Sequence, residues 1–278
     1  MSSVPQARPT PKWLSGADAA IPVMPMVAMK VIELTSNPNV SIAQLSSAVS
    51  KDQVLASRVL GLANSAYSGS MHRISTVTDA IVRLGIGAVR NVVVTVCFTS
   101  RMHDPKIYGA LGPLLVDHAI GTAYMARLVA DKAGADADEA FLYGLLHDIG
   151  KLVILKLAHD HKRRTGQAIG QDELDEALST QHASFGGFTL RRLSLPDELD
   201  EPVSCHHDYA AATTRRKEAL IAYCANRLSH RYGFGCDPDE TDLTGDAGFA
   251  ELGLDAAWLA ETDERAPGLF KIARQFLA

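Results

Sequence analysis

Apolar residues recur every three to four positions along most of the chain, and this spacing predicts amphipathic helices. The segment 24–34, for example, is apolar at 24, 27, 28, 31, 32 and 34, and it ends at the turn Asn37-Pro38-Asn39. Almost no segment alternates apolar and polar residues as a half-buried strand does. We therefore predict an all-α fold. The expected helices cover residues 24–34, 54–63, 76–85, 91–98, 113–132, 138–157, 172–193, 197–206, 216–232, 256–260 and 269–277.

Capping residues mark several of these helix ends. Ser41-x-x-Gln44 and Ser50-x-x-Gln53 both have the form of a capping box, in which each side chain satisfies a backbone N–H of the first turn. Thr76-x-x-Asp79 opens a helix that ends at Gly85. The β-branched residues of segment 91–98 favour a strand by propensity. Since every neighbouring segment is helical and a lone strand has no pairing partner, we predict a helix there.

The composition describes an ordinary globular chain. It has 278 residues, 47% of them apolar, and a net charge of −5, so a strongly basic nucleic-acid binder is excluded as the default. Short basic runs at 162–164, 191–192 and 215–217 are typical of solvated helix ends, and we expect no nucleic-acid partner. No stretch reaches the roughly 20 apolar residues of a membrane span, and the N-terminus lacks the pattern of a secretory signal. Cys97, Cys205, Cys224 and Cys236 form no C-x-x-C pair, which predicts reduced, buried thiols in a cytoplasmic protein without membrane contact.

Ten histidines are the least usual feature, and half of them lie in strongly apolar helical segments. Neutral imidazole and carboxylate groups are the ligands that first-row divalent metals prefer. Any one buried histidine is more simply explained as a hydrogen-bonded core residue, but several on four helices favour a shared polar site, because buried polar groups need partners. The members of this predicted site are His118, His147, Asp148, His182, His206 and His207.

Lys151 lies one turn after His147 on the same helix face, where it could neutralise a phosphate oxygen of a substrate. The other five histidines fall in turns or on polar helix faces, and we predict that they are surface residues. They are His72, His103, His159, His161 and His230.

The string Leu145-Leu146-His147-Asp148-Ile149-Gly150-Lys151 resembles the central motif of the HD superfamily of metal-dependent phosphohydrolases, and His118 resembles its isolated upstream histidine. Further segments resemble the HDOD domain, in one order over about residues 18–230. They are 22–25, 52–60, 64–67 and 80–85 in the N-terminal half, and 182–186, 193–196 and 206–207 in the C-terminal half.

The resemblance implies an HDOD-type helical bundle, with an N-terminal helical subdomain packed on an HD-like one. HDOD domains are bacterial signalling modules related to the HD-GYP cyclic di-GMP phosphodiesterases, and most are thought to be non-catalytic outputs or scaffolds. We therefore expect a flexible tail over 1–15, the HDOD domain over 16–232 with halves 16–112 and 113–232, and an acidic C-terminal extension over 233–278. This extension either packs as extra helices or remains a mobile arm.

The resemblance also implies a ligand set for a divalent metal such as Fe, Mn, Zn or Mg: the six residues of the predicted site, with Asn226 in the place of the final aspartate of the superfamily. An amide oxygen can coordinate a metal, but it carries no charge and cannot act as a base. Leu114 stands where a glutamate would bind a third metal, Leu193 stands in place of the usual tryptophan, and no Gly-Tyr-Pro loop follows His207.

Two functions agree with these residues. In the first, the protein is a signal-transduction output or scaffold that binds a signalling protein, and its HD-type site is metal-binding or vestigial. In the second, it is a metal-dependent phosphohydrolase acting on a nucleotide or other phosphoester, with Asp148 and Lys151 as catalytic residues. The departures at Asn226 and Leu114 favour the first function, since the loss of one ligand typically lowers the rate by orders of magnitude. We expect little or no phosphodiesterase activity on cyclic dinucleotides.

Overall fold

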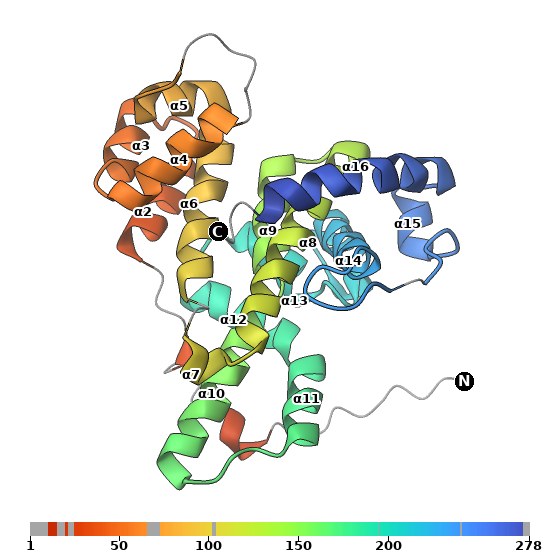
Figure 1. Cartoon of the computed structure of the whole chain (residues 1–278). Helices are drawn as coiled ribbons and strands as arrows, with labels where there is room; N and C mark the ends of the chain where they lie inside the picture. The colour runs from red at the N-terminus through yellow and green to blue at the C-terminus, as the bar shows by residue number, and fades with distance from the viewer. Residues whose placement is uncertain are drawn as a thin grey trace.

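A computed structural model of the chain describes residues 11–15, 20–21, 25–65, 73–101, 104–193, 195–239 and 241–274. Within these ranges every regular element is a helix, which confirms the all-α prediction. The N-terminal helices form one bundle, and the remaining helices surround a long central helix, α8 (Figure 1).

The N-terminal bundle has a hydrophobic core of its own, between residues 28 and 97. The capping box at its second helix is confirmed, because the Gln44 backbone N–H donates to Ser41 and the Gln44 side chain accepts from the Ser41 N–H. The box predicted at Ser50 is wrong: Ser50 ends that helix, and the Asp52 carboxylate caps the next one. The bundle comprises α2 (Met26–Thr35), α3 (Ile42–Val49), α4 (Gln53–Ser65), α5 (Val77–Leu84) and α6 (Ile86–Arg101).

Helix α6 confirms the helical prediction for 91–98 and joins the bundle to the rest of the molecule. Val93 and Cys97 pack in the core of the bundle, whereas Val94 and Phe98 pack in the larger core around α8. The Asn91 amide also donates to the carbonyl oxygen of Asp138 at 3.1 Å. Helix α6 therefore contributes side chains to the hydrophobic cores of both halves.

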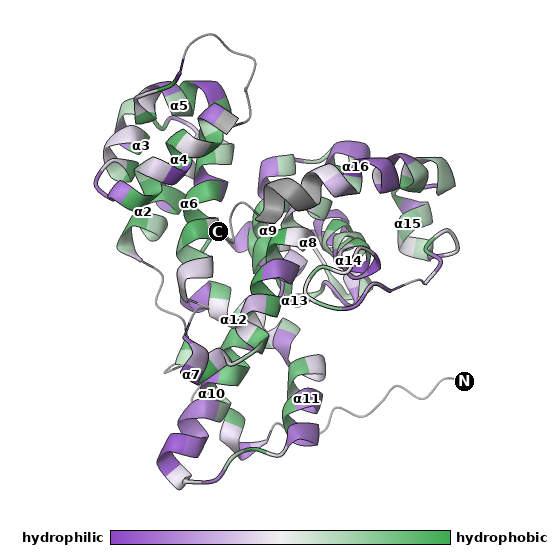
Figure 2. Ribbon diagram, viewed as in Figure 1, coloured by the Kyte–Doolittle hydropathy of each residue, from purple (hydrophilic) through white to green (hydrophobic). Residues whose placement is uncertain are grey.

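The second half contains the larger core, whose centre is α8. Figure 2 shows hydrophobic residues concentrated on the helices in the middle of the molecule and hydrophilic residues towards the far end of α10. The elements are α7 (Pro105–Tyr108), α8 (Leu111–Ala133), α9 (Ala137–Leu146), α10 (Ile149–Thr165), α11 (Gln171–Thr180), α12 (His182–Arg192), η2 (Asp197–Leu199), α13 (Asp200–Ser204), η3 (Tyr209–Ala211) and α14 (Arg216–Arg231).

Two predicted helices are each divided in the structure. Segment 138–157 breaks at His147 and Asp148, between α9 and α10, and segment 172–193 breaks at Gln181, between α11 and α12. Periodicity did not reveal the first break because α9 is buried on all sides and has no polar face whose register could change there. Both breaks place a histidine at or beside the start of a helix.

Both ends of the described chain are packed against the larger half. Trp13 and Leu14, from the segment predicted as a tail, form a short turn, η1 (Lys12–Leu14), buried against α10 and α11. The Trp13 indole N–H donates to Glu173 at 2.7 Å. After residue 232, Phe234, Phe249 and other apolar residues pack into the large core, which includes helices α15 (Ala247–Glu251) and α16 (Ala256–Arg274). The expected helix 269–277 is the end of α16 as far as residue 274; the rest lies outside the described residues.

In the described part of the chain, no single helix has the length and apolar character of a membrane span; α5 and α6 meet that test as a pair, but they are bent by 114° relative to each other.

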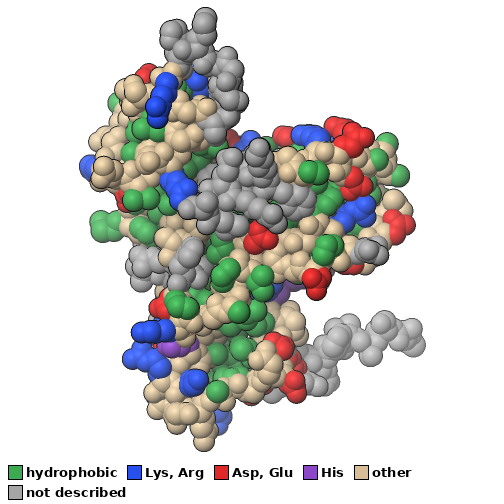
Figure 3. Space-filling model, in the orientation of Figure 1, with side chains coloured by type: hydrophobic (Ala, Val, Ile, Leu, Met, Phe, Trp, Pro, Cys, Tyr) green, Lys and Arg blue, Asp and Glu red, His purple; other side chains and the backbone are tan. Residues whose placement is uncertain are grey.

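The basic runs do not form one continuous patch. Arg191 pairs with Asp200, Arg215 with Glu139, and Arg216 with Glu251. In Figure 3 the acidic residues gather over α15 and α16, while Lys and Arg are spread over α7 and α10 in the lower part of the view. At least three of the eight positive charges in the runs thus pair with neighbouring carboxylates.

Candidate metal centre

The break between α9 and α10 places two adjacent polar side chains inside the core. His147 is fully buried, and its ring Nδ1 donates to the Gly144 carbonyl oxygen in the last turn of α9 at 2.8 Å. A carbonyl oxygen can only accept, so Nδ1 carries the donated proton, and Nε2 is the nitrogen that faces the rest of the site. The end of α9 thus fixes the tautomer that a metal ligand requires.

The first ligand group comprises His118, His147 and Asp148, whose ligand atoms all lie within 4.8 Å of one another. His118 Nε2 is 3.2 Å from His147 Nε2. Asp148 Oδ2 is 3.6 Å and 3.4 Å from these two nitrogens, respectively. His118 has an accepting oxygen at each ring nitrogen, the Phe234 carbonyl oxygen 3.1 Å from Nδ1 and Asn226 Oδ1 3.1 Å from Nε2. When its proton is donated to Phe234, neither Nε2 atom carries a proton to share. Two lone pairs that face each other at this distance repel, and a cation between them would turn the repulsion into two bonds.

The second group comprises His182, His206 and His207, again within 4.8 Å. His182 Nε2 is 3.2 Å from His206 Nε2 and 3.0 Å from His207 Nε2. His206, like His147, donates its Nδ1 proton to a carbonyl oxygen three residues earlier, that of Val203 at 2.7 Å. The exposed edge of this group is His207, whereas His182 and His206 are buried.

Asp148 lies between the two groups, with one oxygen towards each. Oδ2 faces the first group, and Oδ1 is 3.2 Å from His182 Nε2 and 3.9 Å from His206 Nε2 in the second. Lys151 donates to Oδ2 at 2.6 Å. Oδ1 is buried and has no hydrogen-bond donor among the described residues, which is a costly condition for a carboxylate oxygen. The donor set and this oxygen fit divalent metal, which the two histidine groups and Asp148 could hold.

Close packing of α10 on α12 brings the second group to Asp148. A methyl group at Gly150 would overlap the His182 carbonyl oxygen and lie 2.6 Å from the Gly186 nitrogen. Only glycine permits the two helices to cross at this separation. Gly150 therefore positions His182, the first residue of α12, beside the carboxylate.

Burial keeps the imidazoles neutral. It lowers the pKa of His118 to about 3 and that of His182 to about 4, and it lowers the pKa of His206 well below the usual value. Burial alone would raise the pKa of Asp148, but the attraction of His147 and Lys151 is stronger and holds it well below its usual range. At neutral pH the site thus offers a carboxylate anion and three neutral imidazoles, those of His118, His182 and His206.

The structure brings together all six members of the predicted site, with Asn226 Oδ1 3.1 Å from His118 Nε2. His230 was predicted to be a surface residue, but its ring centroid lies 4.7 Å from that of His118. The spacing gave a usable signal, since residues 226 and 230 lie on one face of α14. His159 and His161 are half-buried on α10, and His72 and His103 lie outside the described residues.

Comparison with known families agrees with this arrangement. The sequence model of the HDOD domain matches residues 21–209, more than half of the chain. The chain belongs to the HDOD family. The matched segment includes the whole second ligand group and ends before Asn226.

Curated relatives of this HDOD protein are longer than the chain. An uncharacterized protein of Treponema pallidum is 25% identical over 235 residues, which are 79% of this chain and 44% of that protein. Ribonuclease Y of Thermus thermophilus is 30% identical over 129 residues, which are 46% of this chain and 18% of the enzyme. The chain thus covers less than half the length of these relatives.

Solved structures share the fold over almost the whole chain. An HDOD domain protein of unknown function from Geobacter sulfurreducens has a TM-score of 0.69 at 22% identity, covering 92% of this chain and 93% of that one. A candidate phosphohydrolase from Shewanella amazonensis has a TM-score of 0.70 at 22% identity, with 96% and 98% covered. A candidate signal transduction protein from Marinobacter aquaeolei has a TM-score of 0.71 at 23% identity, with 98% and 62% covered. At these identities the likeness establishes the fold.

Proposed function

We propose that this HDOD protein is a signalling module that holds two divalent metal ions, one in each histidine group, and acts by binding a signalling protein. The observation that carries the metal assignment is the position of Asp148, whose two oxygens face two separate sets of imidazole nitrogens. The ligands would be His118, His147 and Asn226 for one ion and His182, His206 and His207 for the other, with Asp148 shared. The preponderance of imidazole favours Fe, Mn or Zn over Mg.

A binding role agrees better with the site than turnover does. His147 and His206 are completely buried, and Asp148 is 5% exposed, so a substrate would reach the centre only past His207 and the partly exposed Lys151. A catalytic metal needs an open coordination position that its substrate can reach. A buried metal pair instead ties α8, α10, α12 and α13 together and fixes the surface that these helices present to a partner.

Phosphoester hydrolysis is the second candidate function, and the contact between Lys151 and Asp148 favours it. A bound metal pair would supply an activated water, while the Lys151 ammonium is positioned to balance phosphate charge near the exposed His207. Asp148 and Lys151 would then be catalytic residues. Two residues oppose this function. Asn226, with a neutral amide, and Leu114, which is 47% exposed, stand where the HD superfamily pattern has carboxylates, so the centre has two carboxylates fewer than that pattern.

Metal analysis tests the first proposal and separates it from the second. Protein purified without chelators is expected to contain about two equivalents of metal, and EDTA is expected to lower its melting temperature. A screen of cyclic dinucleotides and simple phosphodiesters is expected to show no turnover. Less than one equivalent of metal would contradict the proposed centre, whereas metal-dependent turnover that disappears in His147→Ala would establish the enzyme instead.

A further inference from the structure

Three histidines of the site have a backbone carbonyl oxygen as the partner of Nδ1, and these carbonyl oxygens belong to different segments. His147 and His206 each donate to a carbonyl oxygen three residues earlier, so their own helices orient them. His118 lies within α8, where the backbone carbonyls are used in helical hydrogen bonds. Its Nδ1 donates instead to Phe234, which is 116 residues away in the sequence. The orientation of this one ligand therefore depends on a distant segment.

We propose that the loop over residues 233–236, together with the C-terminal helices that hold it, is a positioning element of the metal centre. The inference rests on the proposed metal function, which it deepens by assigning a role to a segment beyond the HDOD match at 21–209. In this role the Phe234 carbonyl oxygen keeps the His118 proton on Nδ1 and directs Nε2 towards His147 and Asp148.

Close contacts hold the loop against α8. Gly235 has a φ of +67°, which favours glycine, and its N–H donates to the Asp117 carboxylate at 2.8 Å. A methyl group at Gly235 would overlap the Leu114 carbonyl oxygen and lie 2.9 Å from His118 Cβ. Phe234 is 1% exposed, and its ring fills the space that a side chain at Gly121 would occupy. The loop cannot shift outward without releasing His118.

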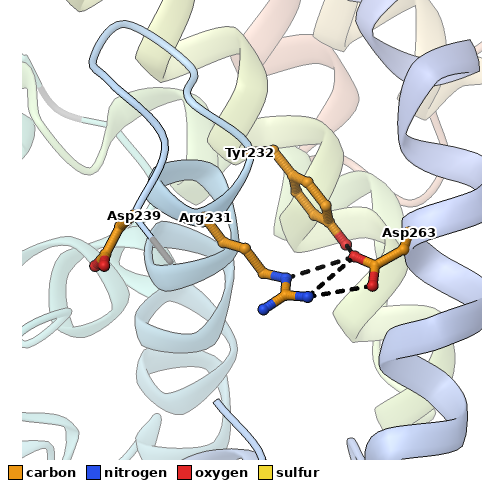
Figure 4. Close-up of a pocket in the computed structure, with 4 residues that line it drawn as sticks. All are labelled: Arg231, Tyr232, Asp239 and Asp263. Carbon is orange, nitrogen blue, oxygen red and sulfur yellow. Dashed lines mark hydrogen bonds and ion pairs between the residues drawn. The ribbon is translucent and has the colours of Figure 1, made fainter. Parts of the chain in front are cut away.

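Helix α16 holds the start of the loop through one carboxylate. Asp263 accepts hydrogen bonds from Arg231 at 3.2 Å and from the Tyr232 hydroxyl at 2.8 Å, and both residues directly precede the loop (Figure 4). These three residues and Asp239 line a pocket of about 420 Å³. The Asp239 N–H donates to the His230 carbonyl oxygen, which closes the loop on the last turn of α14. The C-terminal helix is thus linked to the metal centre through a short series of direct contacts.

A pair of glycines gives a matched test. Gly166, which follows the last residue of α10, also has a positive φ, +75°, but a methyl group there would meet nothing within 4 Å. Gly235→Ala and Gly166→Ala therefore introduce similar backbone strain, but only Gly235→Ala places a methyl group against α8. We expect Gly235→Ala to weaken Mn²⁺ binding about 10- to 100-fold, the range typical of lost outer contacts of a ligand, and Gly166→Ala to leave it unchanged. Asp117→Ala releases the loop without adding a side chain, and it decides the question if Gly235→Ala does not fold.

A second readout is independent of metal. In the metal-free protein at neutral pH, the imidazole ¹⁵N resonances of His118 are expected to show Nδ1–H as the main tautomer. Both Gly235→Ala and Asp117→Ala should raise the Nε2–H fraction, because Asn226 Oδ1, 3.1 Å from Nε2, then becomes the better acceptor. Unchanged Mn²⁺ affinity and an unchanged tautomer in the folded variants would overturn the inference. If the unmodified protein binds no Mn²⁺, the proposed function fails, while the tautomer measurement still decides whether the loop positions His118.

Discussion

Replacing Asp148 with asparagine removes the one negative charge that faces both histidine groups and changes the shape of the side chain very little. The carboxylate oxygens lie 3.2 to 3.9 Å from four imidazole nitrogens, so a single substitution acts on both proposed metal positions. An amide offers one neutral oxygen and cannot bridge two cations. We expect Asp148→Asn to lower the affinity for both ions at least 100-fold.

The change in melting temperature can be worked out from mass action. At a metal concentration 100 times the dissociation constant, each ion stabilises the folded protein by about 2.7 kcal/mol, so the two ions together contribute about 5.4 kcal/mol. In a chain of this length each kcal/mol moves the melting temperature by roughly 2–4 °C, so EDTA should lower it by about 10–20 °C. After a 100-fold loss of affinity at both sites the stabilisation falls to about 0.8 kcal/mol. The shift in Asp148→Asn should then be about 2–3 °C.

Asp160→Asn is the matched control, because Asp160 also pairs with a lysine of α10, Lys156, but in a half-exposed position. Differential scanning fluorimetry of the three proteins with Mn²⁺ and with EDTA measures the shifts. We expect the control to keep the full shift, since exposed ion pairs contribute little to stability. A full shift in Asp148→Asn, or an equal loss in the control, would refute the assignment of Asp148 as the shared ligand.

Three further predictions concern packing, charge and pH. Gly150→Ala should lower the free energy of unfolding by about 1–3 kcal/mol, because the added methyl group overlaps α12. Gly61→Ala is the control: its methyl group would meet no atom within 4 Å, so it should leave the free energy of unfolding unchanged or raise it. Urea unfolding measures both changes. Asn226→Asp should tighten Mn²⁺ binding about 10-fold by adding a charged ligand, and calorimetry showing no change would mean that residue 226 does not contact the metal. In EDTA, the free energy of unfolding should fall by about 3 kcal/mol between pH 6.5 and pH 5. The pKa values of His118 (about 3) and His182 (about 4) in the folded protein lie below the unfolded value near 6.5, so the unfolded chain takes up protons that the folded chain excludes. Equal urea midpoints at the two pH values would contradict this prediction.

The type of fold and the members of the site could be predicted from the sequence because both depend on residue type and local spacing. Helical periodicity was sufficient for α2, α8 and α14, and the histidines stood out because buried imidazole needs partners. Even the β-branched segment in α6 was predicted correctly, since its neighbours left no strand for it to pair with.

The division of the site into two groups could not be predicted in this way. Which nitrogen faces which oxygen of Asp148 depends on how α10 crosses α12, and that crossing requires the absence of a side chain at Gly150. The break at His147 was hidden for a related reason, because a helix buried on every side has no polar face to mark its register. The Phe234 carbonyl oxygen belongs to the backbone, so residue type gave no indication of it.

The shared helix α6 has a consequence for how the molecule folds. Since alternate faces of this helix complete two different cores, neither half can bury its apolar surface fully while the other is unfolded. Heat should therefore unfold the chain in one cooperative transition, with equal calorimetric and van't Hoff enthalpies, although its described residues form three separate hydrophobic clusters. A polypeptide cut between α6 and α7 would expose one face of α6 in one fragment and the surface that covers it in the other, so the two fragments should be more soluble when produced together than when produced alone.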